Sequence, residues 1–89
     1  MATIKKKCWP LEFEEVLGGK KNYELRLADF VVHVGDTLLL KEWDPKIKDY
    51  TGRTVEKKVT FIDTLDLKNI PYWSQEDIKK YGLLLMSLE

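Results

Sequence analysis

The first third of the chain contains a stretch in which apolar residues recur at helical spacing. Its apolar members are Trp9, Phe13, Val16 and Leu17, so they would share one side of a short helix. Pro10 suits the first turn, because its missing N–H would be unpaired there in any residue. The pair Gly18-Gly19 ends the helix, since glycine commonly follows a helix C-terminus. The pattern therefore predicts a helix of about two turns with Trp9 facing the core.

A second helix is predicted near the end of the chain. Ser74 suits the N-cap, and the acidic residues that follow it are favoured by the helix dipole. The helix should run through Lys80, carry Ile78 inward and stop before Gly82. Tyr81 is expected to face the core with it.

Apolar runs elsewhere predict strands, which dominate the chain. The predicted strands cover residues 3–8, 22–27, 37–43, 53–63 and 83–88. The third and fourth should form an antiparallel hairpin whose tip is Tyr50-Thr51-Gly52. The unbroken apolar run of the last strand is typical of a central position in a sheet. Residues 66–73 are expected to form an irregular loop.

This order of elements predicts one small domain that spans residues 1–89. Its class is α+β and dominated by strands, and a mixed β-barrel with two short helices is the simplest closed arrangement. Hydrophobic residues make up 44% of the chain, which is enough for a single core. A domain of this length buries only roughly 60% of the surface its unfolded chain exposes, so each large apolar residue matters.

Charge and cysteine content exclude several classes of function. The chain has 15 basic and 15 acidic residues, which argues against a broad electrostatic grip on nucleic acid but leaves room for a local basic patch. The single cysteine, Cys8, permits no intrachain disulfide and no cysteine-rich metal site. We predict no metal, no cofactor, no membrane span and no signal peptide, and a reducing cytoplasmic setting. Cys8 itself is expected to be buried and inert.

Candidate chemistry concentrates in the motif Gly19-x-Lys21-x-x-Glu24-x-Arg26. On a strand, Glu24 and Arg26 would share one face while Tyr23 and Leu25 look inward. Charged strand faces are usually solvated, so the pattern alone favours a solvent-exposed surface with no binding role. The same groups suit a ligand, because arginine offers a planar fork for phosphate or a base edge and glutamate accepts from an exocyclic amine.

This motif resembles that of the ASCH domain family in the PUA-like superfamily, and other segments match one of its subfamilies in the same order. Those segments are Lys7-Cys8-Trp9-Pro10, Val34-Gly35-Asp36, Glu42-Trp43-Asp44-Pro45, Tyr50-Thr51-Gly52-Arg53 and Met86-Ser87-Leu88-Glu89. The subfamily is known only as a domain of unknown function. The resemblance covers nearly the whole chain and implies a PUA-like pseudobarrel, with a cleft beside the first helix that the charged motif residues line.

The resemblance also implies a ligand class. The family is generally proposed to bind RNA, and some relatives remove the acetyl group of N4-acetylcytidine with a lysine, a threonine and a glutamate. Lys21 matches that lysine, Glu24 stands where the threonine would be, and Glu76 falls roughly where the glutamate would be. The departure at Glu24 favours binding over catalysis.

Three functions follow as hypotheses. The first is a module that binds RNA or a modified nucleotide through Lys21, Glu24 and Arg26, with Lys7 and Trp43 nearby. The second is an amidohydrolase acting on acylated cytidine, with Lys21, Glu24 and Glu76 as its catalytic groups. The third is a module whose cleft takes a peptide. The oligomeric state is left open, and the loop aromatics Trp43 and Trp73 are candidates for stacking on a base.

Overall fold

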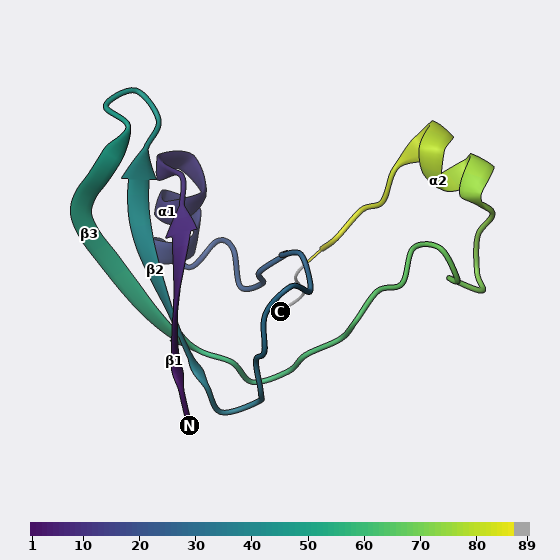
Figure 1. Ribbon diagram of the computed structural model, residues 1–89. Coiled ribbons are helices and arrows are strands. Elements are labelled where there is room, and N and C mark those ends of the chain that lie inside the picture. The colour runs from purple at the N-terminus through teal and green to yellow at the C-terminus, as the bar shows by residue number, and fades with distance from the viewer. Residues whose placement is uncertain (87–89) are drawn as a thin grey trace.

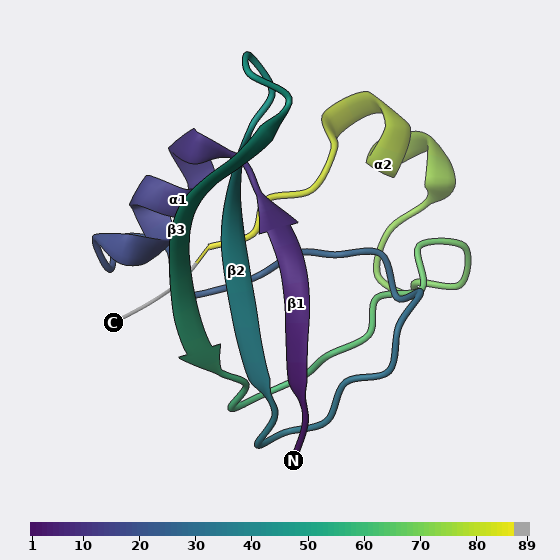
Figure 2. The same cartoon turned by 60° about the vertical axis from the view of Figure 1, so that its left-hand side comes forward.

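The computed structural model describes residues 1–86, which form a mixed three-stranded sheet with one helix packed against it (Figure 1). The elements are β1 (Thr3–Cys8), α1 (Pro10–Leu17), β2 (Thr37–Asp44), β3 (Asp49–Lys58) and α2 (Gln75–Tyr81). Strand β2 is central, parallel to β1 and antiparallel to β3. The three strands run side by side in a second view of the molecule (Figure 2). The result is a β-rich α+β fold.

Helix α1 forms where the sequence predicts it. Trp9 is its N-cap, with an extended backbone, and its carbonyl oxygen accepts from the Phe13 N–H at 2.8 Å. Pro10 occupies the first turn, and Gly18 caps the C-terminus with its N–H on the Glu14 carbonyl at 2.9 Å. The prediction for this helix is therefore confirmed at both ends.

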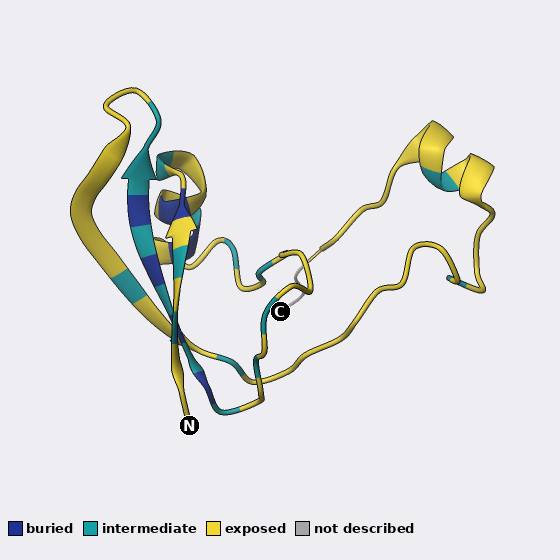
Figure 3. Ribbon diagram, viewed as in Figure 1, coloured by how far each residue is buried: buried dark blue, intermediate teal, exposed yellow. Residues whose placement is uncertain are grey.

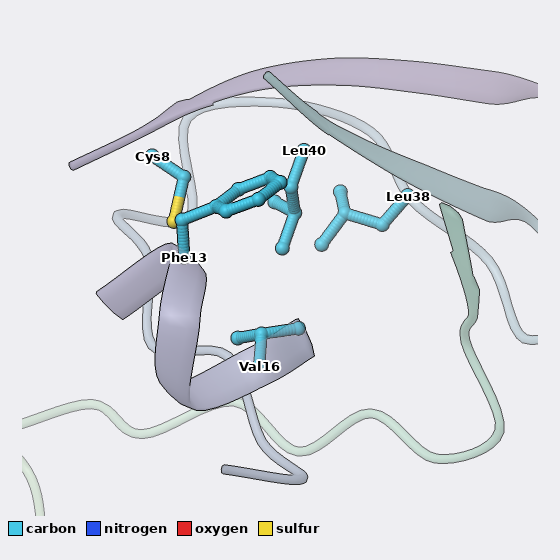
Figure 4. Packing of buried hydrophobic residues seen from close by; sticks show 5 residues of the cluster. All are labelled: Cys8, Phe13, Val16, Leu38 and Leu40. Atoms are coloured by element: carbon cyan, nitrogen blue, oxygen red, sulfur yellow. The ribbon is translucent and has the colours of Figure 1, made fainter. Parts of the chain in front are cut away.

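The core lies between α1 and the sheet. Its buried side chains are Cys8, Phe13, Val16, Leu38 and Leu40. Figure 4 shows the two helical members, Phe13 and Val16, facing the two leucines of β2. Helix α1 covers one face of the sheet, whereas most of β3 remains exposed (Figure 3). Since these five residues are the buried apolar side chains of residues 1–86, the domain depends on each of them.

Strands β2 and β3 confirm the predicted antiparallel hairpin, but its tip lies elsewhere. The chain turns at residues 45–48, where Lys48 has a positive φ of 53°. Gly52 instead lies within β3, with a φ of 94°, in an irregularity that sets the three residues 51–53 opposite Glu42. The prediction of a tip at residues 50–52 was wrong because glycine serves a β-bulge as readily as a turn.

The bulge creates a buried polar cluster on the α1 side of the sheet. Glu42 is 4% exposed, and its carboxylate accepts from Thr51 Oγ1 at 2.6 Å and from Arg53 Nε and Nη2 at 2.9 and 2.8 Å. Arg53 also pairs with Glu14 of α1, and its guanidinium lies 4.9 Å from the centre of the Phe13 ring. The cluster therefore links the hairpin to the helix.

A turn before β2 fastens the start of the sheet. The buried Asp36 carboxylate accepts from the backbone N–H groups of Ala2 and His33, each at 2.9 Å. These bonds hold the pKa of Asp36 below its usual value. Gly35 has a φ of 98°, which favours glycine, and a Cβ there would meet the Met1 side chain at 3.2 Å. The segment thus ties the N-terminus to β2.

Residues 1–86 do not form the expected closed barrel. Residues 22–27 and 83–86 are not strands, so the sheet of the described chain keeps two open edges, β1 and β3. Part of the last predicted strand, residues 87–88, lies outside the described residues. A strand exists only when its backbone finds a neighbour to pair with. Residues 22–27 are held to the end of β1 by a side chain, as described below, rather than by a backbone ladder.

The segment that follows β3 extends away from the sheet. Helix α2 confirms the prediction, since Ser74 Oγ accepts from the Asp77 N–H at 3.1 Å, and residues 66–73 are irregular as expected. The helix stands apart from α1 and the strands in both views (Figures 1 and 2). Ile78 is partly buried, but Tyr81 is 73% exposed, so its predicted place in the core was wrong. The radius of gyration is accordingly 15.1 Å, against about 12 Å for a compact chain of this length.

Residues 1–86 contain neither a helix that could span a membrane nor a cluster of side chains that could hold a metal ion. None of the helices there has the length and apolar character needed to cross a membrane. Likewise, no group of three or more histidine, cysteine, aspartate or glutamate side chains is placed to hold a metal ion within that range.

Candidate functional site

The charged motif begins with a sharp reversal after α1. Gly19 takes a positive φ of 79°, and the backbone N–H groups of Lys20 and Lys21 both donate to the Glu15 carbonyl oxygen at 3.0 Å. The Asn22 side chain donates to the Gly19 carbonyl at 3.3 Å. These bonds turn the chain back, so that the motif continues alongside the carboxyl end of β1.

Arg26 fastens the motif to that strand. Its Nη2 donates to the Lys7 carbonyl oxygen at 2.6 Å, and its Nε donates to Glu24 Oε2 at the same distance. Glu24 and Arg26 thus form an ion pair. It does not lie on a regular strand face, and Tyr23 and Leu25, which were expected to look inward, are 38% and 69% exposed.

These segments enclose an open cleft of about 610 Å³ beside the start of α1. The lining residues are Lys7, Trp9, Glu12, Lys21, Tyr23, Glu24, Leu25, Arg26 and Leu85. They come from the end of β1, the first turn of α1, the motif and the last described part of the chain. Residues far apart in the sequence therefore meet at one site.

More basic than acidic side chains line the cleft, namely Lys7, Lys21 and Arg26 against Glu12 and Glu24. Among residues 1–86, neither Lys7 nor Lys21 has a carboxylate oxygen within 4.0 Å, whereas Glu24 is paired with Arg26. The Lys7 ammonium lies 4.2 Å from the centre of the Trp43 ring, and that of Lys21 lies 5.3 Å from the centre of the Tyr23 ring. Both lysines can move to meet an anion, because contacts with aromatic faces are weak at exposed sites.

Trp9 is a cleft residue that the sequence pattern placed in the core. It is 55% exposed, and its ring centre lies 6.5 Å from that of Trp43 with the planes 35° apart. Helical spacing from Phe13 suggested burial, but the N-cap lies outside the helical dihedrals, so the helix periodicity does not fix its direction. The proline at the next position was the available signal that Trp9 is a cap residue.

The structure brings most of the predicted site residues together. Lys7, Lys21, Glu24 and Arg26 all line the cleft. Trp43 is half-buried, contacts Trp9 and Lys7, and does not line the cleft. The other candidates, Trp73 and Glu76, lie at or next to α2, away from the sheet, and neither lines the cleft.

Cys8 lies beneath the cleft as a buried thiol. It is 3% exposed and faces Phe13 and Leu40 in the core (Figure 4). Burial raises the pKa of Cys8, and the carboxylates of Glu24 and Glu12 raise it further. Its thiol contacts the Trp9 carbonyl oxygen at 3.7 Å. A buried thiol with a raised pKa is a poor nucleophile, which agrees with the expectation of an inert cysteine.

This environment gives a test of the core. We expect Cys8 to react with a disulfide reagent at pH 8 at least about 100-fold more slowly in the native protein than in denaturant, because attack requires an opening of the domain. The measurement is the absorbance of the released thiol against time. Equal rates in the two conditions would contradict the buried position, and Cys8→Ser provides the blank.

Together the fold and the site define a small β-rich α+β domain with an open cleft of mixed charge. The chain belongs to the family described as Domain of unknown function (DUF3850), whose model matches residues 3–71. That range includes β1, α1, the hairpin and every cleft residue except Leu85.

A curated relative from a bacteriophage is similar to this chain. It is described as an uncharacterized 12.9 kDa protein in the GpA 3' region of Escherichia phage P2, and it is 38% identical over 72 residues. The match covers 81% of this chain and 60% of the relative, so the chain spans about 60% of that protein's length. No solved structure gave a significant match.

Proposed function

We propose that the cleft binds RNA or a modified nucleotide. The observation that carries this proposal is the pair of lysines, Lys7 and Lys21, that lack carboxylate partners among residues 1–86 and line the same cleft as exposed aromatic rings. Cations beside aromatic faces suit a ligand that combines phosphate with flat bases. The sequence resemblance to the RNA-associated ASCH domain family supports the same ligand class.

Arg26 adds a donor that is already oriented. A guanidinium has five N–H donors, and two of them are used, one on Glu24 and one on the Lys7 carbonyl. The other three lie on the two terminal nitrogens, where they can hold a phosphate by two parallel bonds. Because Arg26 is fixed by the protein, little of its side-chain freedom remains to be lost on binding.

The proposed electrostatic contacts with phosphates are confined to the cleft, because the chain as a whole has no net charge. With two or three phosphate contacts, log K for a single strand should fall with log salt at a slope of about −1.4 to −2. A much steeper slope would require cations outside the cleft.

The test is binding of labelled RNA oligonucleotides, single-stranded and structured, measured by fluorescence anisotropy. We expect Lys21→Ala to weaken binding at least about tenfold, since it removes a charge-assisted contact. Arg26→Ala should do the same. Lys20→Ala is the matched control, because Lys20 is adjacent and exposed but does not line the cleft. Circular dichroism must show that each variant is folded.

The proposal fails if no RNA in the panel binds, or if folded Lys21→Ala and Arg26→Ala bind like the wild type. Incubation with N4-acetylcytidine, followed by chromatography for cytidine, tests the amidohydrolase hypothesis with the same preparations. Product that disappears in Lys21→Ala would favour the enzyme. Protein capture that survives nuclease treatment would favour a peptide-binding module.

A further inference from the structure

The exposed ring of Trp9 gives the cleft a flat apolar surface beside its cations. From this we infer that Trp9 stacks on an unpaired base, so that the cleft prefers single-stranded RNA to duplex. The inference rests on the proposed function and narrows its ligand class. It also moves the stacking role to Trp9, which lines the cleft, from Trp43 and Trp73, which were the candidates from the sequence.

The Trp9 side chain is positioned by its own backbone and by a neighbouring ring. The backbone is fixed as the N-cap of α1, with the carbonyl bonded to the Phe13 N–H. Trp43 packs beside the ring at 6.5 Å between centres, and the Lys7 ammonium covers Trp43 at 4.2 Å. Because the backbone of Trp9 is fixed and a second ring packs against its side chain, the side chain loses little conformational entropy when a base stacks on it.

The predicted preference for single strands follows from the geometry of nucleic acids. The faces of a base within a duplex are covered by its neighbours, whereas a splayed base in a single strand offers its face to an aromatic side chain. Every base has such a face, so stacking alone gives weak sequence preference. Lys7 and Lys21 line the same cleft and can meet the phosphates of that strand.

Exposure alone does not make an aromatic a base platform, and Trp73 shows the difference. Trp73 is 53% exposed, but its ring packs edge-on against Tyr72 at 5.8 Å. The nearby hollow of about 310 Å³ contains Tyr72 and the carboxylates Asp63 and Asp66, and no lysine or arginine lines it. This hollow offers carboxylates and no cation to a phosphate, whereas three cations outnumber the two carboxylates of the cleft, so Trp73 serves as the control for Trp9.

The experiment compares a short mixed-sequence RNA oligonucleotide with the same strand annealed to its complement. We expect Trp9→Ala to weaken single-strand binding about 5- to 150-fold, the range found when one stacking residue is truncated. Trp9→Phe, which keeps a ring, should stay within about threefold of the wild type. Trp73→Phe should leave binding unchanged, and the wild type should bind the duplex more weakly than the single strand.

A fluorescence measurement keeps the inference testable if Trp9→Ala does not fold. In the double variant Trp43→Phe with Trp73→Phe, Trp9 is the sole tryptophan, and a base stacked on it should quench its emission as the oligonucleotide is added. Binding without quenching would overturn the inference. So would a folded Trp9→Ala variant with wild-type affinity while Lys21→Ala is impaired, and that outcome would leave the proposed function standing. If the wild-type protein binds no RNA at all, both the proposed function and the inference about Trp9 fail.

Discussion

Replacing Phe13 with alanine is expected to lower the free energy of unfolding by about 3–5 kcal/mol. Phe13 is 1% exposed and is one of the two largest fully buried side chains in the described chain. It joins α1 to β2 in the core and also carries the Arg53 guanidinium over its ring. Its removal therefore leaves a cavity at the place where the helix meets the sheet.

The effect is large relative to what holds this domain together. Native domains have about 0.05–0.15 kcal/mol of stability per residue, which amounts to roughly 4–13 kcal/mol for 89 residues. With only five buried apolar side chains in residues 1–86, we expect the lower part of that range. Phe13→Ala should then keep only about 0–2 kcal/mol, so it should be partly unfolded near room temperature, with a weaker circular dichroism signal than the wild type and a urea midpoint close to zero denaturant.

Two variants of the same helix control this prediction. Phe13→Leu keeps most of the buried volume and should show a smaller loss, with a cooperative transition still visible. Leu11 is 76% exposed, so Leu11→Ala should change the stability by no more than about 0.5 kcal/mol. Equal losses in Leu11→Ala and Phe13→Ala would mean that α1 does not pack on the sheet as described.

The sequence predicted the elements that local signals determine. Proline in the first turn and glycine after the last turn located α1, and the Ser74 cap located α2. The antiparallel pairing of β2 and β3 also followed from two apolar segments close in the chain. In each case the decisive contacts lie within a few residues or across one hairpin, where pattern and structure are directly coupled.

Contacts between distant segments were not predictable in the same way. The alternating residues 22–27 have the composition of a strand, yet within residues 1–86 no strand pairs with their backbone, and Arg26 attaches them to β1 through its side chain. The location of the cleft was nevertheless expected, because the resemblance to the ASCH domain family implied a cleft beside the first helix, lined by the charged motif. Trp9 was misplaced because its direction depends on the cap geometry rather than on the helix period.

The buried polar cluster was missed for a different reason. Leu38, Leu40 and Glu42 have the same parity on β2, and all three are buried. An acidic residue at the end of such a series signals a buried carboxylate that needs partners. The partners, Thr51 and Arg53, come into place only because the bulge in β3 sets both opposite Glu42, and a bulge has no unique sequence signature.

This cluster also connects the core to the candidate site. Arg53 joins Glu42 of β2 to Glu14 of α1. The N-cap of the same helix supplies Trp9 to the cleft, and its first turn supplies Glu12. A substitution in the cluster should therefore move α1 relative to β1. It should alter the shape of the cleft although the substituted residue does not line it. Stability variants of Glu42 must accordingly be checked for RNA binding separately.

Glu42→Ala is expected to lower the Tm by about 10 °C, because it leaves the Arg53 guanidinium and the Thr51 hydroxyl without their buried acceptor. Glu42→Gln, which keeps the shape and one acceptor, should lose less. The exposed Glu56 of β3 is the matched control, and Glu56→Ala should shift the Tm by no more than about 2 °C. Equal shifts in Glu42→Ala and Glu56→Ala would contradict the cluster.

The same carboxylate makes the stability of the protein depend on pH in a defined window. The hydrogen bonds from Arg53 and Thr51 lower the pKa of Glu42 from 4.5 to about 2. Between these two pKa values the unfolded chain binds more protons than the native protein, so the free energy of unfolding rises with pH. The contribution of Glu42 to stability is complete above about pH 4.5 and is lost as the pH falls toward about 2. Urea titrations across this window should give a shallower slope for Glu42→Gln than for the wild type. The remaining slope includes Asp36, whose pKa is also lowered by its backbone bonds. Identical slopes in the two proteins would show that Glu42 is not held as a carboxylate by Arg53.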